Sequence, residues 1–307
     1  EVYFRMDKVI RKSLLVYNPK SGNADLILNN FDLICKKFLK KNITLTLYSI
    51  NRGYNKLSEI MKNEKYDILI LSGGDGTLSR CLSDLYNENI EFPDVAVFPT
   101  GTSNDLSSSL KHGNDINERI ENVTEGKLQS VDFGVINGKE IFLSSYAGGL
   151  FTKVSYATDK NLKKIMGKTA YHINGLSELA NIKEFEFNLT LDTGEKLTEK
   201  AILFIIINGK SVGGFDRVTN DASINDGHMN LIIVKSIANP FDIPQILIDL
   251  FNNNLVNNDY VIEIVTRKCI IEKIEGEINI SIDGEEGENR KVEIEFIKDK
   301  LKIFKKV

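Results

Sequence analysis

The sequence predicts a protein of two domains, an α/β domain with a doubly wound parallel sheet and a second domain rich in β-strands. The first observation is the length of 307 residues, which exceeds what one hydrophobic core usually organises. The second is that apolar runs of strand length alternate with helical periodicity up to residue 130. The third is a change after Val131-Asp132-Phe133-Gly134, where most segments become strand-like and turn signals separate them, as in two packed sheets.

In the first domain, predicted strands end in loops rich in glycine and polar residues. The expected strands cover residues 13–17, 43–48, 66–71 and 95–98, and the expected helices cover residues 26–39, 57–61 and 78–86. Ligands of doubly wound sheets bind at the carboxyl ends of the strands. Because the loops at residues 18–22, 72–77 and 99–105 all lie at such ends, we expect them to share one binding edge.

The loop Ser72-Gly73-Gly74-Asp75-Gly76-Thr77 has the composition of a phosphate-binding turn. It lies between an apolar strand and a helix with leucines at positions 78, 82 and 85. This arrangement brings backbone N–H groups and a helix N-terminus against an anion, and the glycines let the main chain approach a ligand. Asp75 could orient a metal or a hydroxyl group. A tight turn with a capping aspartate explains the same residues.

The two neighbouring loops also carry groups suited to phosphate. Asn18-Pro19-Lys20-Ser21-Gly22 offers backbone N–H groups, the Ser21 hydroxyl and the charge of Lys20. Pro99-Thr100-Gly101-Thr102-Ser103-Asn104-Asp105 gathers hydroxyls, an amide and a carboxylate. The alternatives are an ordinary turn for the first loop and a helix cap at Asn104 or Asp105 for the second.

The second domain is expected to consist mostly of strands. They are predicted at residues 140–145, 184–191, 201–207, 229–234, 260–265, 268–274, 278–282 and 291–296, with helices at about residues 169–181 and 240–255. Turn signals such as Asn137-Gly138 separate them. Residues 159–168 mix basic and apolar side chains, which suits either contact with an anionic membrane surface or a solvated loop.

Two acidic turns in the second domain are candidates for chemistry. Ser281-Ile282-Asp283-Gly284-Glu285-Glu286-Gly287-Glu288 is rich in carboxylates, and an extended chain would point Asp283 and Glu285 to the same face. Such a pair can hold Mg²⁺ with one member while the other removes a proton. An acidic solvated hairpin is the alternative. Asn225-Asp226-Gly227 needs no explanation beyond a hairpin-type turn, and the three histidines show no metal spacing.

Composition excludes several classes of function. The charged fraction of 27% and the hydrophobic fraction of 42% are ordinary for a soluble globular protein. A net charge of −4 argues against a nucleic-acid binder. The three scattered cysteines predict reduced thiols in a cytosolic protein and no zinc site. The longest apolar run, residues 201–207, is far shorter than the ~20 residues that span a bilayer.

Taken together, the motifs resemble those of the soluble bacterial diacylglycerol kinases, a lipid kinase family related to sphingosine kinases and more distantly to NAD kinases. The resemblance covers nearly the whole chain after Met6 and rests on the motifs Asn18-Pro19-Lys20-Ser21-Gly22, Gly73-Gly74-Asp75-Gly76-Thr77, Pro99-Thr100-Gly101-Thr102-Ser103-Asn104-Asp105, Asn225-Asp226-Gly227-His228-Met229 and Asp283-Gly284-Glu285. It implies an ATP-binding α/β domain at residues 7–130 with a return of residues 297–307. It also implies a C-terminal β-sandwich domain at residues 131–296, with the active site in the cleft between the domains.

The resemblance further implies roles for individual residues. Catalysis would depend on Asp75, which positions Mg²⁺, and on Glu285, which accepts the hydroxyl proton with support from Asp283. A structural Mg²⁺ would bind near Ser223 and His228, chiefly through Asp226. ATP would be bound by the segments that contain Asn18, Pro19, Lys20, Ser21, Gly22, Gly73, Gly74, Asp75, Gly76, Thr77, Leu78, Ser79 and Thr102, and Asn104 and Asp105 match the Asn-Asp pair of the family.

The expected activity is therefore phosphoryl transfer from ATP to a lipid hydroxyl, with diacylglycerol to phosphatidic acid as the default reaction. Sphingoid bases, other glycerolipids and NAD stay open as acceptors, and a catalytically inactive lipid- or nucleotide-binding regulator is the alternative from another class. We expect a cytoplasmic protein that contacts the inner face of the membrane peripherally and binds no nucleic acid. We also expect a homodimer, and this expectation rests on the resemblance alone.

Overall fold

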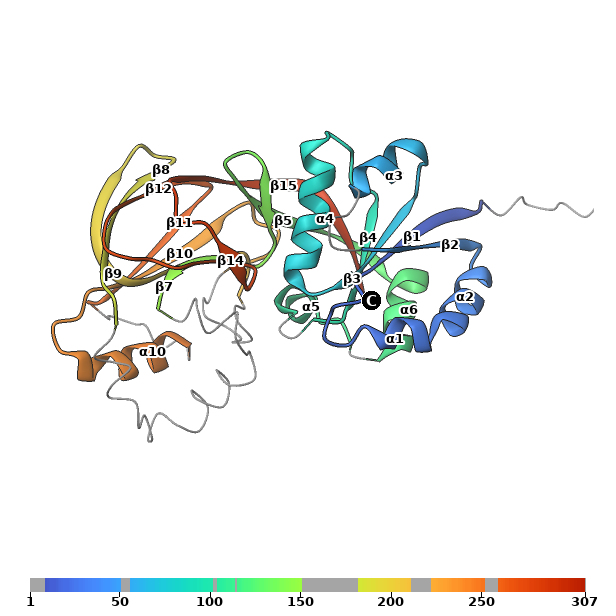
Figure 1. Ribbon diagram of the computed structural model, residues 1–307, viewed down its shortest axis with the longest axis horizontal. Coiled ribbons are helices and arrows are strands. Elements are labelled where there is room, and N and C mark those ends of the chain that lie inside the picture. Colours follow the sequence, from blue (N-terminus) through green and yellow to red (C-terminus); the bar gives the residue numbers. More distant parts are fainter. Residues whose placement is uncertain are drawn as a thin grey trace, which may run out of the picture. The chain divides into compact units, whose positions relative to one another are not determined.

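The computed structural model describes residues 9–50, 56–101, 104–113, 115–150, 182–210, 222–251 and 259–306 (Figure 1). The chain divides into two compact units. The first comprises Glu1–Gly101, Leu110–Gln129 and Leu301–Val307, and the second comprises Thr102–Ser109 and Ser130–Lys300. Strands β5 (Lys127–Ile136) and β15 (Val292–Lys305) each begin in one unit and end in the other.

The sheet of the first unit is parallel throughout. Strand β1 (Arg11–Tyr17) pairs with β2 (Ile43–Ser49) on one side and with β3 (Ile68–Gly73) on the other, and β4 (Asp94–Pro99) follows β3. The last strand, β15, adds to the free side of β4 where Ile303 pairs with Val95. In the order β15-β4-β3-β1-β2, successive strands are added on opposite sides of the β1/β3 pair. The topological switch point therefore lies between β1 and β3, which is where ligands bind in such sheets.

Helices cover both faces of this sheet (Figure 1). Helix α3 (Leu57–Asn63) packs against α4 (Asp75–Asn87), and α2 (Phe31–Leu39), which follows the short α1 (Asp25–Asn29), packs against α6 (Ile116–Glu125). All six residues of β3 are buried, as expected for a parallel strand covered on both sides. Helix α6 begins at Asp115, whose carboxylate caps the helix by accepting a bond from the N–H of Asn117. The doubly wound α/β prediction is confirmed.

The second unit is built around the long strand β9 (Lys196–Ile207). It pairs antiparallel with β7 (Ser145–Gly149), β8 (Phe185–Leu191) and β10 (Met229–Lys235). Shorter pairings extend the sheet through β6 (Glu140–Phe142), β11 (Val261–Thr266), β12 (Lys268–Glu275), β13 (Ile280–Ile282) and β14 (Glu285–Gly287). Helix α5 (Asp105–Ser109) and helix α10 (Ile243–Phe251), which follows the 3₁₀ turn η1 (Pro240–Asp242), complete the unit as far as the structure describes it.

Strand β9 explains the longest apolar run of the sequence. Phe204 and Ile206 face one core cluster, whereas Leu203 and Ile205 face another that includes Ile243 from the start of α10. Side chains of a strand alternate between its two faces, so a strand buried on both sides must be apolar at every position. The apolar run at residues 201–207 is therefore a strand that is buried on both of its faces.

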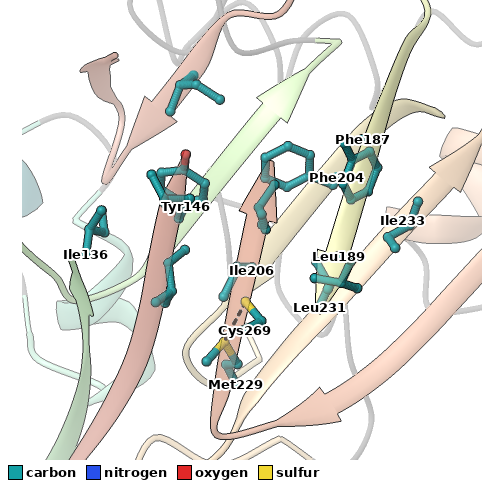
Figure 2. Packing of buried hydrophobic residues seen from close by; sticks show 14 of the residues in the cluster. Ile136, Tyr146, Phe187, Leu189, Phe204, Ile206, Met229, Leu231, Ile233 and Cys269 are labelled. Carbon is teal, nitrogen blue, oxygen red and sulfur yellow. Dashed lines mark hydrogen bonds between the residues drawn. The ribbon is translucent and has the colours of Figure 1, made fainter. Parts of the chain in front are cut away.

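Aromatic rings fill the first of these clusters (Figure 2). Phe204 lies 5.5 Å from Phe187 and 5.8 Å from Tyr146, measured between ring centroids, and Phe185 lies 5.7 Å from Phe187. Aromatic rings at these separations contact one another and stabilise the fold by more than the apolar area they bury. This cluster forms the packed interior of the β-sandwich that the sequence predicted.

Most predicted elements are present, with shifted ends. The helix predicted at 240–255 is observed as η1 and α10, and the strand predicted at 291–296 continues to residue 305 as β15. The helix predicted at about residues 169–181 and the basic stretch at 159–168 lie outside the described residues. Within the described ranges, every helix is too short or too polar to cross a lipid bilayer.

Candidate active site

Asn18 joins two of the predicted loops at the carboxyl edge of the first unit. Its backbone N–H donates to the carbonyl of Ser72 at 3.2 Å, and its side-chain amide donates to the Thr77 hydroxyl at 2.9 Å. The same residue shapes its own loop, because its side-chain oxygen accepts a bond from the N–H of Lys20. A single asparagine therefore connects the end of β1 to the turn that follows β3.

The third loop meets the same turn. The N–H of Thr100 donates to the carbonyl of Gly73 at 3.0 Å, and the carbonyl of Thr100 accepts a bond from the N–H of Asn23 at 2.9 Å. The hydroxyl oxygens of Ser72 and Thr100 lie 3.5 Å apart. The loops after β1, β3 and β4 thus form one connected edge, as the sequence predicted from their positions at strand ends.

Two glycines permit this close approach. A Cβ atom at Gly73 would lie 2.6 Å from the Cβ of Thr77, and a Cβ at Gly74 would lie 3.3 Å from the Cα of Gly101. Contacts under 3 Å are essentially never seen for real Cβ atoms, so Gly73 has no tolerated replacement without movement of Thr77. The glycines serve the packing of the edge as well as any ligand.

Helix α4 points its N-terminus at this edge. It starts at Asp75, which is 7% exposed, and the N–H of Thr77 bonds back to Gly74. The first turn of a helix carries partial positive charge and N–H groups that favour anions. The hydroxyl of Ser79 donates to the carbonyl of Asp75, Leu78 is buried, and the N–H of Leu78 donates to the carbonyl of Gly74 at 3.2 Å, so contact of these two residues with ATP stays a prediction.

The remaining predicted nucleotide residues are placed less tightly. Lys20 is exposed, as are Pro19 and Gly22, and the Ser21 hydroxyl donates to the carbonyl of Asn18. Thr102 and Ser103 lie outside the described residues. Asn104 has a positive φ of 53°, and Asp105 begins α5 in the second unit with 6% exposure.

In the second unit, Asp283 and Glu285 do not share a face. Asp283 (φ 48°) and Gly284 (φ 81°) form the two-residue turn between β13 and β14, so the chain is not extended through them. Asp283 is 9% exposed, whereas Glu285 is exposed to solvent. The expectation of a same-face pair is wrong, because the turn reverses the chain between the two acids.

The carboxylate of Asp283 is fully engaged with the backbone. It accepts bonds from the N–H groups of Leu143 at 2.7 Å, Ser144 at 2.8 Å and Ser145 at 2.9 Å. Hydrogen bonds to an ionised acceptor are the strong ones. The proton acceptor predicted in this hairpin is therefore better placed at Glu285, where the side chain is accessible.

The turn at residues 223–228 is closed on itself. One oxygen of Asp226 accepts a bond from the N–H of Ser223 at 3.0 Å, and the other accepts a bond from the N–H of His228 at 2.9 Å. His228 Nε2 accepts from Arg267 Nε at 3.1 Å, so Nδ1 carries the proton and donates to the carbonyl of Asp226. Both ring nitrogens of His228 thus have hydrogen-bond partners in this structure, and a role of His228 at a metal stays a prediction.

Asp132 and Asn208 are two buried, hydrogen-bonded polar residues that the sequence did not single out. Asp132 is fully buried and accepts a bond from the N–H of Gly227 at 2.5 Å, beside Asp226. Burial raises the pKa of the Asp132 carboxyl. A charged residue between the apolar Val131 and Phe133 was the available signal for Asp132, whereas nothing in the sequence around Asn208 distinguishes it from a loop residue.

The described residues contain no group of three or more histidine, cysteine or acidic side chains that would hold a metal. The side chains of Ser223, Asn225 and Asp226 present oxygen atoms in this turn, and oxygen is the ligand atom that Mg²⁺ and Ca²⁺ prefer. Each Asp226 oxygen accepts one N–H and keeps a further lone pair. The donor chemistry of this turn is therefore compatible with a hard cation held by Asp226.

Comparisons with known proteins identify the class of protein and then its family. Residues 12–136 match the diacylglycerol kinase catalytic domain, and residues 144–305 match the YegS C-terminal NAD kinase beta sandwich-like domain. A diacylglycerol kinase of Staphylococcus saprophyticus is 32% identical over 227 residues, which cover 73% of each chain. The enzyme of Staphylococcus carnosus is 29% identical over 279 residues, covering 90% of this chain and 89% of that one.

Solved structures share the fold. A diacylglycerol kinase from Bacillus anthracis superposes with a TM-score of 0.70 at 22% identity, covering 96% of this chain and 97% of that one. Yeast NADH kinase superposes with a TM-score of 0.50 at 11% identity, covering 97% and 84% of the two chains. The architecture is that of a two-domain kinase with an α/β domain and a β-sandwich. The chain belongs to the diacylglycerol kinase family.

Proposed function

We propose that the protein transfers the γ-phosphate of ATP to the hydroxyl of a lipid, with diacylglycerol as the acceptor and phosphatidic acid as the product. The observation that supports this most directly is the connected edge made by Asn18, Thr77 and Thr100 at the N-terminus of α4. Glycines at positions 73 and 74 allow Thr77 and Gly101 to approach the main chain at that edge, and the N-terminus of a helix favours anions. Family membership supplies the reaction type.

In the proposed reaction the lipid hydroxyl oxygen attacks the γ-phosphorus, and the bond from that phosphorus to the β-bridging oxygen breaks to release ADP. The hydroxyl proton passes to Glu285, an exposed carboxylate in β14. Backbone N–H groups at the start of α4, with Lys20 nearby in sequence, would balance the charge of the phosphates. Asp75 would hold Mg²⁺, which neutralises charge on the transferred group, and Asp226 would hold a structural Mg²⁺.

The proposed acceptor is lipid, so the enzyme would work at a membrane surface. We place it in the cytoplasm with peripheral contact at the inner face of the membrane, and we include homodimer formation in the proposal. The family, whose name gives a lipid as the acceptor, supports the membrane contact, whereas the homodimer rests on the resemblance alone. Flotation with vesicles and light scattering test these two points directly.

A phosphorylation screen tests the function. The purified chain is incubated with γ-labelled ATP and Mg²⁺, and with detergent micelles that carry diacylglycerol, monoacylglycerol, phosphatidylglycerol or sphingosine; NAD is supplied in solution. We expect labelled phosphatidic acid and at least about tenfold less product from the other acceptors. A larger yield from NAD or a sphingoid base would replace the proposed acceptor, and no labelled product from any acceptor would favour a regulator without catalysis.

A further inference from the structure

The segment Leu143-Ser144-Ser145 enters β7 between the ends of two other strands. Strand β7 pairs antiparallel with β9 and with β13. Strand β9 ends at Ile207 and is followed by Asn208, and β13 ends at Ile282 and is followed by Asp283. Asn208 and Asp283 therefore flank the segment from opposite sides, at the edge where Glu285 begins the next strand.

Asp283 makes four hydrogen bonds to this segment. Its carboxylate accepts from the N–H groups of Leu143, Ser144 and Ser145, at 2.7, 2.8 and 2.9 Å. Its own N–H donates to the carbonyl of Ser145 at 2.9 Å. The three N–H groups all donate to one carboxylate, so a displacement of the Asp283 turn would break the three hydrogen bonds together.

Asn208 completes the set from the other side. Its backbone N–H donates to the carbonyl of Ser144 at 2.9 Å, and its side-chain amide donates to the carbonyl of Leu143 at 2.9 Å. The same amide also donates to the carbonyl of Asp132 at 2.6 Å. All three N–H groups and all three carbonyls of Leu143-Ser144-Ser145 thus have their partners in Asp283 and Asn208.

We propose that Asp283 and Asn208 form a clamp on residues 143–145 that fixes the Asp283-Gly284 turn and so positions Glu285 for proton transfer. This inference rests on the proposed function of Glu285. Asp283 is a positioning residue in this scheme and does not accept the proton. A proton on its carboxyl would face N–H donors, and at least one of the three bonds would be lost.

Two substitutions keep the shape of the side chain and exchange a hydrogen-bond acceptor for a donor, or a donor for an acceptor. Asp283→Asn places an NH₂ group against backbone N–H donors, and Asn208→Asp places an oxygen against the carbonyls of Leu143 and Asp132. The matched control is Glu286→Gln, which removes an exposed carboxylate from β14, the strand that carries Glu285. All three variants and the wild type are assayed as full-length chains.

We expect each clamp variant to lower kcat by about tenfold to a hundredfold while KM for ATP stays within about threefold, because a small displacement of a proton acceptor affects chemistry more than nucleotide binding. Glu286→Gln should stay within about twofold of wild type. The acidic limb of the kcat–pH profile should persist in Asp283→Asn and disappear in Glu285→Gln. Wild-type kcat in Asp283→Asn, or loss of its acidic limb, would overturn the proposal.

Hydrogen exchange separates the clamp from the proposed function. In Asp283→Asn the amides of Leu143, Ser144 and Ser145 should exchange at least about tenfold faster than in wild type, while the amides of β3 are unchanged. Unchanged exchange at residues 143–145 would refute the clamp whatever the activity. A wild type that phosphorylates no lipid would refute the function and leave the exchange result standing.

Discussion

Asp75 is the side chain of the first unit that the proposal places at Mg²⁺. It opens α4 at the edge that joins the loops, and it is 7% exposed. Asp283 was expected only to support Glu285 in catalysis, and the structure gives its carboxylate three backbone partners. The two aspartates therefore have different proposed roles, Asp75 as a holder of Mg²⁺ and Asp283 as a residue that fixes a turn.

Replacement of Asp75 tests the first of these roles. We expect Asp75→Asn to reduce kcat for lipid phosphorylation by about a hundredfold or more, since the amide cannot hold Mg²⁺ as the carboxylate does. The matched control is Asp25→Asn, an exposed aspartate that also begins a helix, α1. Similar activities in the two variants would remove Asp75 from the mechanism.

His112 links stability to pH in the first unit. Burial lowers the pKa of its imidazole below the ordinary 6.5, with Arg119 adding to the effect, although the bond from Nε2 to the carbonyl of Phe304 acts against it. The unfolded chain therefore binds this proton more readily, so stability falls as pH drops from 6.5 through the lower folded pKa. Urea denaturation of His112→Gln, which can keep a donor to Phe304, should show a smaller loss over this window. A loss equal to that of wild type would exclude His112 as the source.

The turn from β3 into α4 is an element in which sterics and function coincide. Gly73→Ala should destabilise the first unit by about 1–3 kcal/mol, because its Cβ would lie 2.6 Å from that of Thr77. Gly74→Ala should cost less stability, since the nearest atom to its Cβ would be 3.3 Å away. Chemical denaturation of the two variants measures the difference, and an equal or reversed order would contradict the packing described for this turn.

The aromatic cluster is the corresponding element of the second unit (Figure 2). Phe204→Ala should destabilise that unit by about 3–5 kcal/mol, since Phe204 is buried between Phe187 and Tyr146. The matched control is Phe241→Ala, where the ring is 69% exposed and the expected change is within about 0.5 kcal/mol. Thermal unfolding followed by near-ultraviolet circular dichroism compares the two, and a small effect of Phe204→Ala would show that the cluster is not a principal source of stability.

Elements were predictable where local pattern and burial agree. Alternating strand and helix signals located the parallel sheet, and Asn137-Gly138 marked a turn that does adopt positive φ at both residues. The continuity of β15 was not predictable, because its exposed residues 298–300 interrupt the apolar pattern and divide one strand into two apparent pieces. The loop contacts of Asn18 also follow from tertiary packing, and the sequence indicated only that the loops share an edge.

For the whole molecule, the proposal requires that Asp75 of the first unit and Glu285 of the second serve one reaction. The distance between the two residues in the sequence does not show whether they act in the same reaction, so we propose a kinetic test. If both groups act in the same phosphoryl-transfer step, the double variant Asp75→Asn/Glu285→Gln should be about as slow as the slower single variant. Fully multiplicative losses in kcat would indicate that the two residues contribute independently.

Strand β15 has a consequence for the order in which the protein can be completed. Within the described residues, the border of β4 that faces away from β3 pairs with β15 at Ile303, which lies far along the chain from Val95. During synthesis, β1 to β4 emerge early, yet β4 keeps an unpaired border and His112 lacks its acceptor at Phe304 until residues 301–305 have been made. The sheet of the first unit is thus completed only by residues made long after β4, and a chain truncated before residue 301 should expose β4 to pairing with other chains.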